Sequence, residues 1–91
     1  MEWYKFYITY YDGMILERYA LVKDKWDLFG IIGWQYAFSI KKIDRIDYEK
    51  REPKDDEMNK VMSIPRSNFI RQDFVMERNG GFDEFIKREI H

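Results

Sequence analysis

Two runs of alternating apolar and polar residues lie near the start of the chain, on either side of an Asp-Gly pair. Residues 3–11 and 14–22 are rich in aromatic and β-branched side chains, and Asp12-Gly13 separates them. An Asp-Gly pair between two such runs is typical of a β-hairpin with a two-residue turn. The pattern therefore predicts a hairpin over residues 3–22.

A two-residue turn pairs Tyr10 with Ile15 and gives the hairpin two unlike faces. One face is mostly apolar, and we expect it to pack into the core. Glu17 falls on this apolar face, which also fits a register shifted by one residue. The other face is mixed and suits either solvent or a binding partner; it carries Trp3, Tyr7, Tyr11 and Arg18.

The pattern changes to that of a short helix at residues 25–35, which are apolar on nearly all sides. Asp24 suits the N-cap position, and Asp27 follows three residues later in a weak capping-box arrangement. Gly30 and Gly33 each weaken such a helix by about 1 kcal/mol relative to Ala. Glycines at these positions fit a helix that lies close against the sheet.

The remaining elements follow from three further segments. Residues 36–49 alternate and predict a strand with an irregularity near Lys41-Lys42. Residues 69–77 fit a strand or a helix. The spacing of apolar residues over 82–90 predicts an amphipathic helix. The whole chain, 1–91, is expected to form a single α+β domain of order β-β-α-β-β-α, with an antiparallel sheet and helices packed on one face.

Composition adds a high aromatic content to this picture. Aromatic residues make up 19% of the chain, charged residues 36%, and the net charge is −1. Seventeen large rings exceed what a core of this size easily holds, so some are expected at the surface, where they favour interfaces. The alternative is a core that uses aromatic residues in place of Leu and Val. The sequence leaves both open for the hairpin rings.

The residue inventory argues against catalysis and against metal or cofactor binding. The chain has no cysteine, and its one histidine is the terminal His91. A terminal residue is poorly held for general-base chemistry. No carboxylates are spaced as metal ligands, and no serine lies in a nucleophile motif. We therefore predict a protein that is not an enzyme and needs no cofactor or metal.

A basic run near residue 41 supports a nucleic-acid hypothesis. The run holds Lys41, Lys42, Arg45, Lys50, Arg51 and Lys54. Basic residues beside aromatic rings on a strand are one way of holding single-stranded nucleic acid, here over residues 36–54. Acidic residues interleave with the run and cancel much of its field, so this stays the alternative.

The leading hypothesis is a protein-interaction module whose partner is another protein or protein complex. Aromatic residues with a charged surround resemble a binding hot spot, and Trp34 at the end of the predicted helix joins the hairpin rings as a candidate. A sharper form is a phage or mobile-element inhibitor that occludes a site on a host complex such as a defence nuclease. This form is an analogy of type with no motif behind it.

Two further expectations concern the surroundings of the chain. No apolar run approaches the roughly 20 residues of a membrane span, and no signal peptide is seen, so a cytoplasmic protein is expected. An exposed strand edge on the hairpin also admits a homodimer formed by strand addition.

Overall fold

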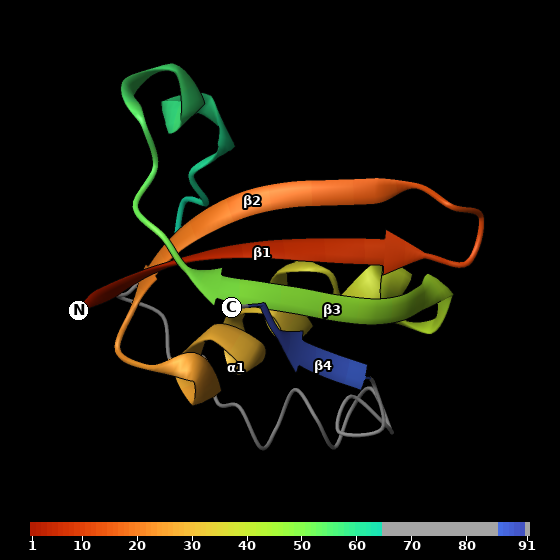
Figure 1. Cartoon of the computed structure of the whole chain (residues 1–91). Helices are drawn as coiled ribbons and strands as arrows, with labels where there is room; N and C mark the ends of the chain where they lie inside the picture. The colour runs from red at the N-terminus through yellow and green to blue at the C-terminus, as the bar shows by residue number, and fades with distance from the viewer. Residues whose placement is uncertain (65–85, 91) are drawn as a thin grey trace.

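A four-stranded sheet with a helix on one face forms the centre of the protein. The computed structural model describes residues 1–64 and 86–90. The strands lie in the order β2-β1-β3-β4 (Figure 1). In chain order the elements are β1 (Glu2–Tyr10), β2 (Ile15–Val22), α1 (Lys25–Gln35), the 3-10 helix η1 (Ala37–Lys42), β3 (Ile43–Lys50), the 3-10 helix η2 (Asp55–Lys60) and β4 (Ile86–Glu89). The α+β class is confirmed.

The β1–β2 hairpin forms as predicted but with a register one residue away from that of a two-residue turn. Tyr4 pairs with Ala20 and Thr9 with Ile15. The turn contains three residues, and Gly13 at its end has a φ of +91°. A three-residue turn that ends in a left-handed residue is the next most common way to close a hairpin. This register moves Glu17 off the apolar face, which removes the inconsistency seen in the sequence.

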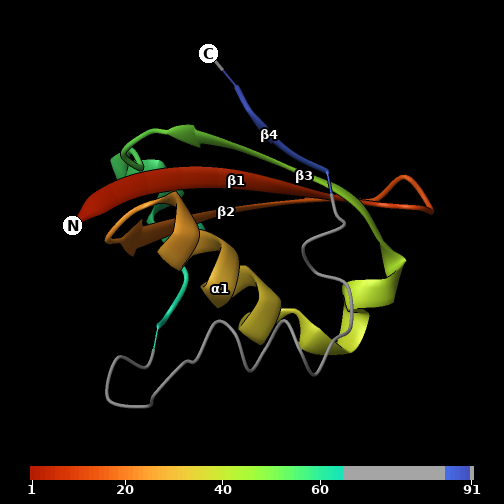
Figure 2. The same ribbon diagram turned by 90° about the horizontal axis from the view of Figure 1, so that it is seen from below.

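The core lies between the sheet and α1, on the face that also carries η1 (Figure 2). Asp24 caps α1 by accepting a hydrogen bond of 2.9 Å from the Asp27 amide, as predicted. Both helix glycines are buried. The buried apolar cluster consists of Tyr4, Phe6, Ile8, Tyr10, Ala20, Val22, Leu28, Phe29, Ile31, Ile32, Ile40, Ile43, Ile46 and Tyr48.

The predicted strand over residues 36–49 is wrong in its first part. Residues 37–42 form η1, and the strand begins only at Ile43. Phe38 is fully exposed whereas Ile40 is buried, so these two residues do not share a strand face. The irregularity expected near residue 42 is a bulge at Asp44. Thr9 pairs with Arg45 and Tyr10 pairs with Ile43, so Asp44 is the extra residue of β3 at this point.

The predicted helix over residues 82–90 is wrong where the structure describes it. Residues 86–89 form β4, which pairs with β3 in parallel rather than antiparallel. The Ile90 amide donates a hydrogen bond of 2.8 Å to the Tyr48 carbonyl. A nine-residue helix is marginal by itself, whereas pairing with β3 satisfies an otherwise open sheet edge. The segment 69–77, for which strand and helix both remained open, lies outside the described residues.

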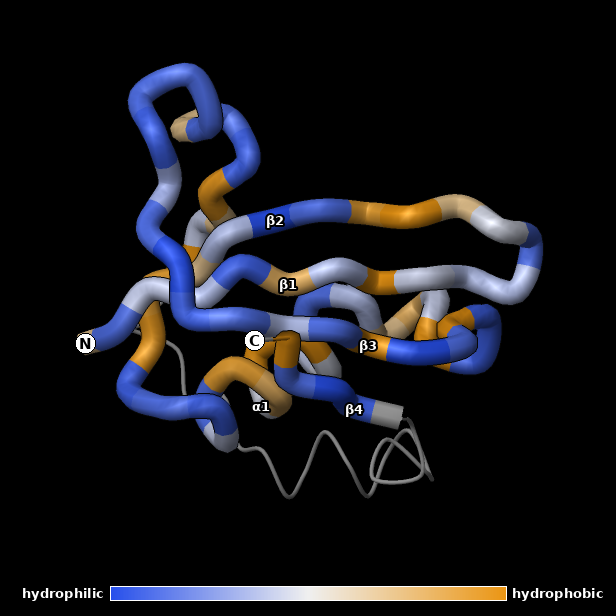
Figure 3. The backbone as a smooth tube through the Cα atoms, viewed as in Figure 1, coloured by the Kyte–Doolittle hydropathy of each residue, from blue (hydrophilic) through white to orange (hydrophobic). Residues whose placement is uncertain are grey.

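The segment after β3 carries mostly hydrophilic residues and folds back beside β2 (Figure 3). The Met62 amide donates a hydrogen bond of 2.8 Å to the Tyr19 carbonyl, and Val61 forms a parallel bridge with Tyr19. This contact covers part of the outer edge of β2. No helix within residues 1–64 and 86–90 has the length and apolar character to cross a membrane.

Candidate functional site

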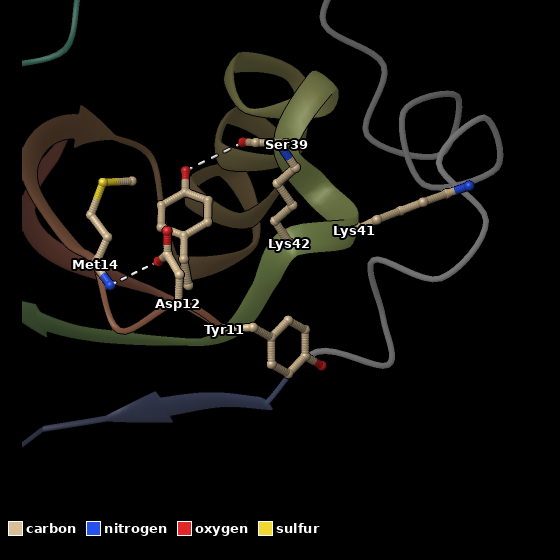
Figure 4. A pocket seen from close by; sticks show the side chains of 7 residues that line it. Tyr11, Asp12, Met14, Ser39, Lys41 and Lys42 are labelled. Carbon is tan, nitrogen blue, oxygen red and sulfur yellow. Dashed lines mark hydrogen bonds between the residues drawn. The ribbon is translucent and has the colours of Figure 1, made fainter.

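The end of the molecule that carries the β1–β2 turn holds a pocket of about 460 Å³. The pocket is built from the turn and from η1 (Figure 4). A backbone hydrogen bond of 3.0 Å from the Tyr11 amide to the Lys42 carbonyl joins these two segments. The lining residues are Tyr10, Tyr11, Asp12, Met14, Ser39, Lys41 and Lys42.

Local hydrogen bonds fix the shape of the turn. The Gly13 amide donates to the Tyr10 carbonyl at 2.9 Å, and the Tyr10 amide donates to the Met14 carbonyl at 2.8 Å. The Met14 amide donates to Asp12 Oδ1 at 2.9 Å, the side-chain turn that aspartate often makes. The turn is therefore held internally, and Tyr11 and Met14 keep most of their side-chain surface exposed.

The polar side chains at the inner end of the pocket already have partners. Tyr10 is buried, and its hydroxyl lies 3.3 Å from Ser39 Oγ. Ser39 Oγ also donates to the Tyr36 carbonyl at 3.3 Å. Among the described residues, Ser39 Oγ has hydrogen bonds to the Tyr10 hydroxyl and the Tyr36 carbonyl and none to a histidine or carboxylate. These residues therefore give Ser39 no hydrogen-bonded base for nucleophilic chemistry.

Large apolar side chains are exposed around this pocket. The exposed fraction is 71% for Tyr11, 55% for Met14 and 106% for Phe38, which precedes Ser39 in η1. Ile15 is also exposed, but it pairs with Thr9 and lies on the opposite face of the sheet, outside this group. Single exposed apolar residues are ordinary, but a group of them marks an interaction site. We call the set Tyr11, Met14, Phe38, Lys41 and Lys42 the hairpin-end surface.

The two lysines of this surface differ from most of the basic run that follows them. Arg45 Nε lies 3.2 Å from Asp47 Oδ2, and Lys50 Nζ lies 3.2 Å from Glu2 Oε1. Arg51 approaches two carboxylates, at 3.7 and 3.9 Å. Lys41 and Lys42 are exposed and form no ion pair within residues 1–64 and 86–90. Their charges remain available to a partner.

The structure brings three of the predicted binding residues together at the pocket. Tyr11 was predicted as part of the hairpin face, and Lys41 and Lys42 as part of the separate basic run. The hydrogen bond between the Tyr11 amide and Lys42 carbonyl places all three on one surface. The pairing of β1 with the end of η1 was not readable from the sequence.

The other predicted binding residues lie elsewhere. Trp3 and Tyr7 lie on the sheet face away from α1 and are partly buried. Arg18 pairs with Phe6 rather than Tyr7 because of the shifted register, and its Nη1 donates to the Glu17 carbonyl at 2.7 Å. Trp34, 37% exposed, lies near the end of α1. The basic residues Arg45, Lys50 and Arg51 follow β3 away from the pocket.

The sequence did not indicate five residues of the pocket and its surround as binding residues: Tyr10, Asp12, Met14, Phe38 and Ser39. The alternation of Phe38 with Tyr36 and Ile40 predicts a strand face, and the hairpin pattern predicts a paired strand position for Met14. The signal for Met14 was its position beside the Asp-Gly turn, since apolar residues that flank a turn are often uncovered at the end of a sheet.

A second polar feature lies on the sheet face opposite α1, and we call it the buried ion cluster: Lys5, Glu17, Tyr19, Arg51 and Glu57. Lys5 Nζ lies 3.1 Å from Glu17 Oε1 and 4.0 Å from Glu57 Oε2, and only 7% of its side chain is exposed. The Tyr19 hydroxyl donates to Glu57 Oε2 at 2.7 Å. These contacts attach η2 to the sheet.

The charges of the buried ion cluster stabilise one another. Burial by itself lowers the pKa of Lys5, but hydrogen bonds to Glu17 and Tyr7 outweigh it and raise the pKa above its ordinary value. Burial and the hydrogen bond to Glu57 raise the pKa of Tyr19. The hydrogen bond from Tyr19 lowers the pKa of Glu57. All of these groups have partners, so the cluster is a structural contact rather than a reactive site.

Among the residues that the structure describes, no group of three or more histidine, cysteine, aspartate or glutamate side chains is placed to hold a metal ion. Comparison with protein-family models, with curated proteins and with solved structures found no significant match.

Proposed function

We propose that the protein is a non-enzymatic interaction module that binds another protein through the hairpin-end surface. The observation that carries this proposal is the grouping, around one pocket, of exposed apolar side chains and two lysines that form no ion pair with the described residues. Elsewhere in the described chain, the charged side chains that line the sheet are mostly paired with one another.

The chemistry of the surface supports a protein partner. Aromatic side chains and methionine are enriched in the central part of protein interfaces, and charged residues are common at the rim. Tyr11, Phe38 and Met14 supply the first kind of surface, and Lys41 and Lys42 the second. Tyrosine and phenylalanine also lose little conformational entropy when they are fixed in a contact.

In its sharper form, the proposal makes the protein a phage or mobile-element inhibitor that occludes a site on a host complex such as a defence nuclease. Small size and dense mixed charge support this form by analogy. A surface at one end of a small domain is also suited to insertion into a site on a larger molecule.

Site-specific photo-crosslinking in the cells that express the protein tests the proposal. We expect a photoreactive phenylalanine derivative in place of Phe38 to give a discrete protein adduct on irradiation. The matched control places the same group at Trp26, another exposed aromatic residue, 57% exposed, on α1. Equal adducts from both positions, or adducts destroyed by nuclease rather than protease, would contradict the proposal.

The alternative function is binding of single-stranded nucleic acid by residues 36–54. Tyr11 and Phe38 beside Lys41 and Lys42 favour it, since rings stack on bases and lysines neutralise phosphates. Against it, Tyr48 is buried beneath α1 in this region. Affinity for an oligonucleotide that falls steeply with salt would support the alternative.

A further inference from the structure

We infer that the hairpin-end surface recognises a short acidic segment of its protein partner, with one large apolar side chain in the pocket and carboxylates beside Lys41 and Lys42. This inference rests on the proposed function and specifies the chemistry of the partner. It follows from what the pocket offers, from which charges are available, and from which backbone groups are already used.

The pocket offers an apolar contact to a single large side chain. Tyr10 and Tyr11 contribute rings, and Met14 contributes a flexible thioether that adapts to the shape of its neighbour. Its volume of about 460 Å³ exceeds a typical side chain, so it accepts an aromatic or a long aliphatic group. Phe38, which is fully exposed and precedes the lining residue Ser39 in η1, adds apolar surface beside the pocket.

The charged residues that line the pocket favour a negatively charged partner segment. Lys41 and Lys42 line the pocket from η1, whereas Asp12 lies in the turn and uses Oδ1 to accept the Met14 amide (Figure 4). A carboxylate of the partner is therefore attracted to the η1 side and repelled from the turn side. Complementary charge of this kind raises association rate and specificity more than affinity.

The backbone groups around the pocket argue against phosphate as the ligand. Anion sites for phosphate commonly use free amide groups or a guanidinium fork. The amides of Tyr11, Gly13 and Met14 are all donated to acceptors within the protein. No arginine is among the described residues that line the pocket. The lysine side chains supply its positive charge, which suits carboxylates on a flexible peptide.

The edge of β2 argues against recognition by strand addition. The Glu17 carbonyl accepts a hydrogen bond from Arg18, and the Tyr19 carbonyl accepts one from the Met62 amide. Two of the outward carbonyls of this edge are thus occupied, and a partner strand would displace both bonds. Recognition by side chains in the pocket requires no such displacement.

Selection from a random peptide library displayed on phage tests the inference. We expect the protein to enrich peptides with Asp or Glu within a few positions of a large apolar residue. The double variant K41E/K42E should enrich Lys or Arg beside the same apolar residue. An acidic peptide selected by the unchanged protein should bind this variant about tenfold or more weakly, because two attractive pairs become repulsive.

The control variant is K23E/K54E, which makes the same change in net charge at two exposed lysines outside the pocket lining. It should select the same acidic peptides as the unchanged protein. Both variants should keep the melting temperature of the unchanged protein, as exposed lysines contribute little to stability.

Three other outcomes would contradict, in turn, the acidic partner, the proposed function and the assignment to this pocket. Apolar peptides selected without regard to charge, by both proteins alike, would overturn the acidic partner and leave protein binding in place. A selection that enriches no peptide, together with binding of a single-stranded oligothymidine that is lost in K41E/K42E, would overturn the proposed function itself. Enrichment lost in K23E/K54E as well would show attraction by overall charge, and would overturn the assignment to this pocket.

Discussion

At the scale of single residues, exposure separates the aromatic side chains of the hairpin into two kinds. Tyr11 is 71% exposed at the turn, whereas Tyr7 is partly buried and its ring centroid lies 5.0 Å from Lys5 Nζ. The sequence placed both on one mixed face and left open whether they belong to the core or to an interface. In the structure, Tyr11 belongs to the hairpin-end surface and Tyr7 packs on the buried ion cluster.

Replacing each tyrosine by alanine should separate these roles. Tyr11→Ala should change the free energy of unfolding by no more than about 0.5 kcal/mol, as exposed sites do. Tyr7→Ala should lower it by about 1–3 kcal/mol, because it removes packing around Lys5. Urea unfolding measures both. Equal losses of stability would show that Tyr11 is also a core residue.

The buried ion cluster makes stability depend on pH through Glu57. The pKa of Glu57 is lower in the folded protein, so its stabilisation is present above pH 4.5 and is lost as the pH falls through the folded value. The free energy of unfolding should therefore drop less on acidification in Glu57→Gln than in the unchanged protein. Urea unfolding between pH 7 and pH 3 measures this. The control Glu52→Gln, at an exposed position, should behave like the unchanged protein.

At the scale of elements, the β1–β2 turn positions the pocket and depends on one glycine. Gly13 has a φ of +91°, and nothing lies within 4 Å of the position where a Cβ would be. Any loss on substitution is therefore a backbone cost and not a steric clash with neighbours. The three-residue turn also sets the register that directs Glu17 toward Lys5.

We expect Gly13→Ala to lower the free energy of unfolding by about 1 kcal/mol or somewhat more, because alanine resists positive φ. Gly13→Asn should lose less, since asparagine tolerates the left-handed region better. Thermal or urea unfolding of the two variants measures the difference. If alanine and asparagine cost the same, the turn has rearranged in the variants and the three-residue geometry is not required.

The elements that the sequence missed share one cause. The segment 36–42 has strand-like alternation but forms η1, and the segment 86–89 has helix-like spacing but forms β4. In both segments the apolar pattern is short and is compatible with the period of a helix and with that of a strand. Tertiary contacts select the structure: Ile40 packs in the core as part of η1, and residues 86–89 pair with the edge of β3.

At the scale of the whole molecule, the surface proposed for binding and the buried ion cluster that holds η2 lie in different regions. The hairpin-end surface lies at the turn, whereas η2 and the contacts of Glu57 lie toward the opposite end of the sheet (Figure 1). These regions share no hydrogen bond or ion pair among the described residues. Substitutions in one should therefore leave the other unchanged.

A pair of variants tests this separation. Phe38→Ala should weaken binding of a selected acidic peptide without changing the free energy of unfolding, because Phe38 is fully exposed. Tyr19→Phe should lower the free energy of unfolding by about 1 kcal/mol, because Glu57 loses a donor, and should leave binding unchanged. The double variant should be additive within about 0.5 kcal/mol, measured by calorimetry and urea unfolding. A larger deviation would show that the two regions are coupled.

The sequence by itself determined the features that depend on neighbours in the chain. The hairpin over residues 3–22, the helix 25–35 with its Asp24 cap and the α+β class all follow from local pattern and turn chemistry. Tyr11, Lys41 and Lys42 were also identified as candidates from residue type alone.

Only the tertiary structure decided what depends on distant contacts. The parallel pairing of β4 and the junction of the turn with η1 each depend on residues far apart in sequence. It also brought Arg88 to the carboxylate of Asp47, which lies 41 residues earlier in the chain and is already contacted by its strand neighbour Arg45. The physical reason is that exposure and charge pairing depend on how the elements pack together. A short apolar or charged run in the sequence is compatible with more than one such packing.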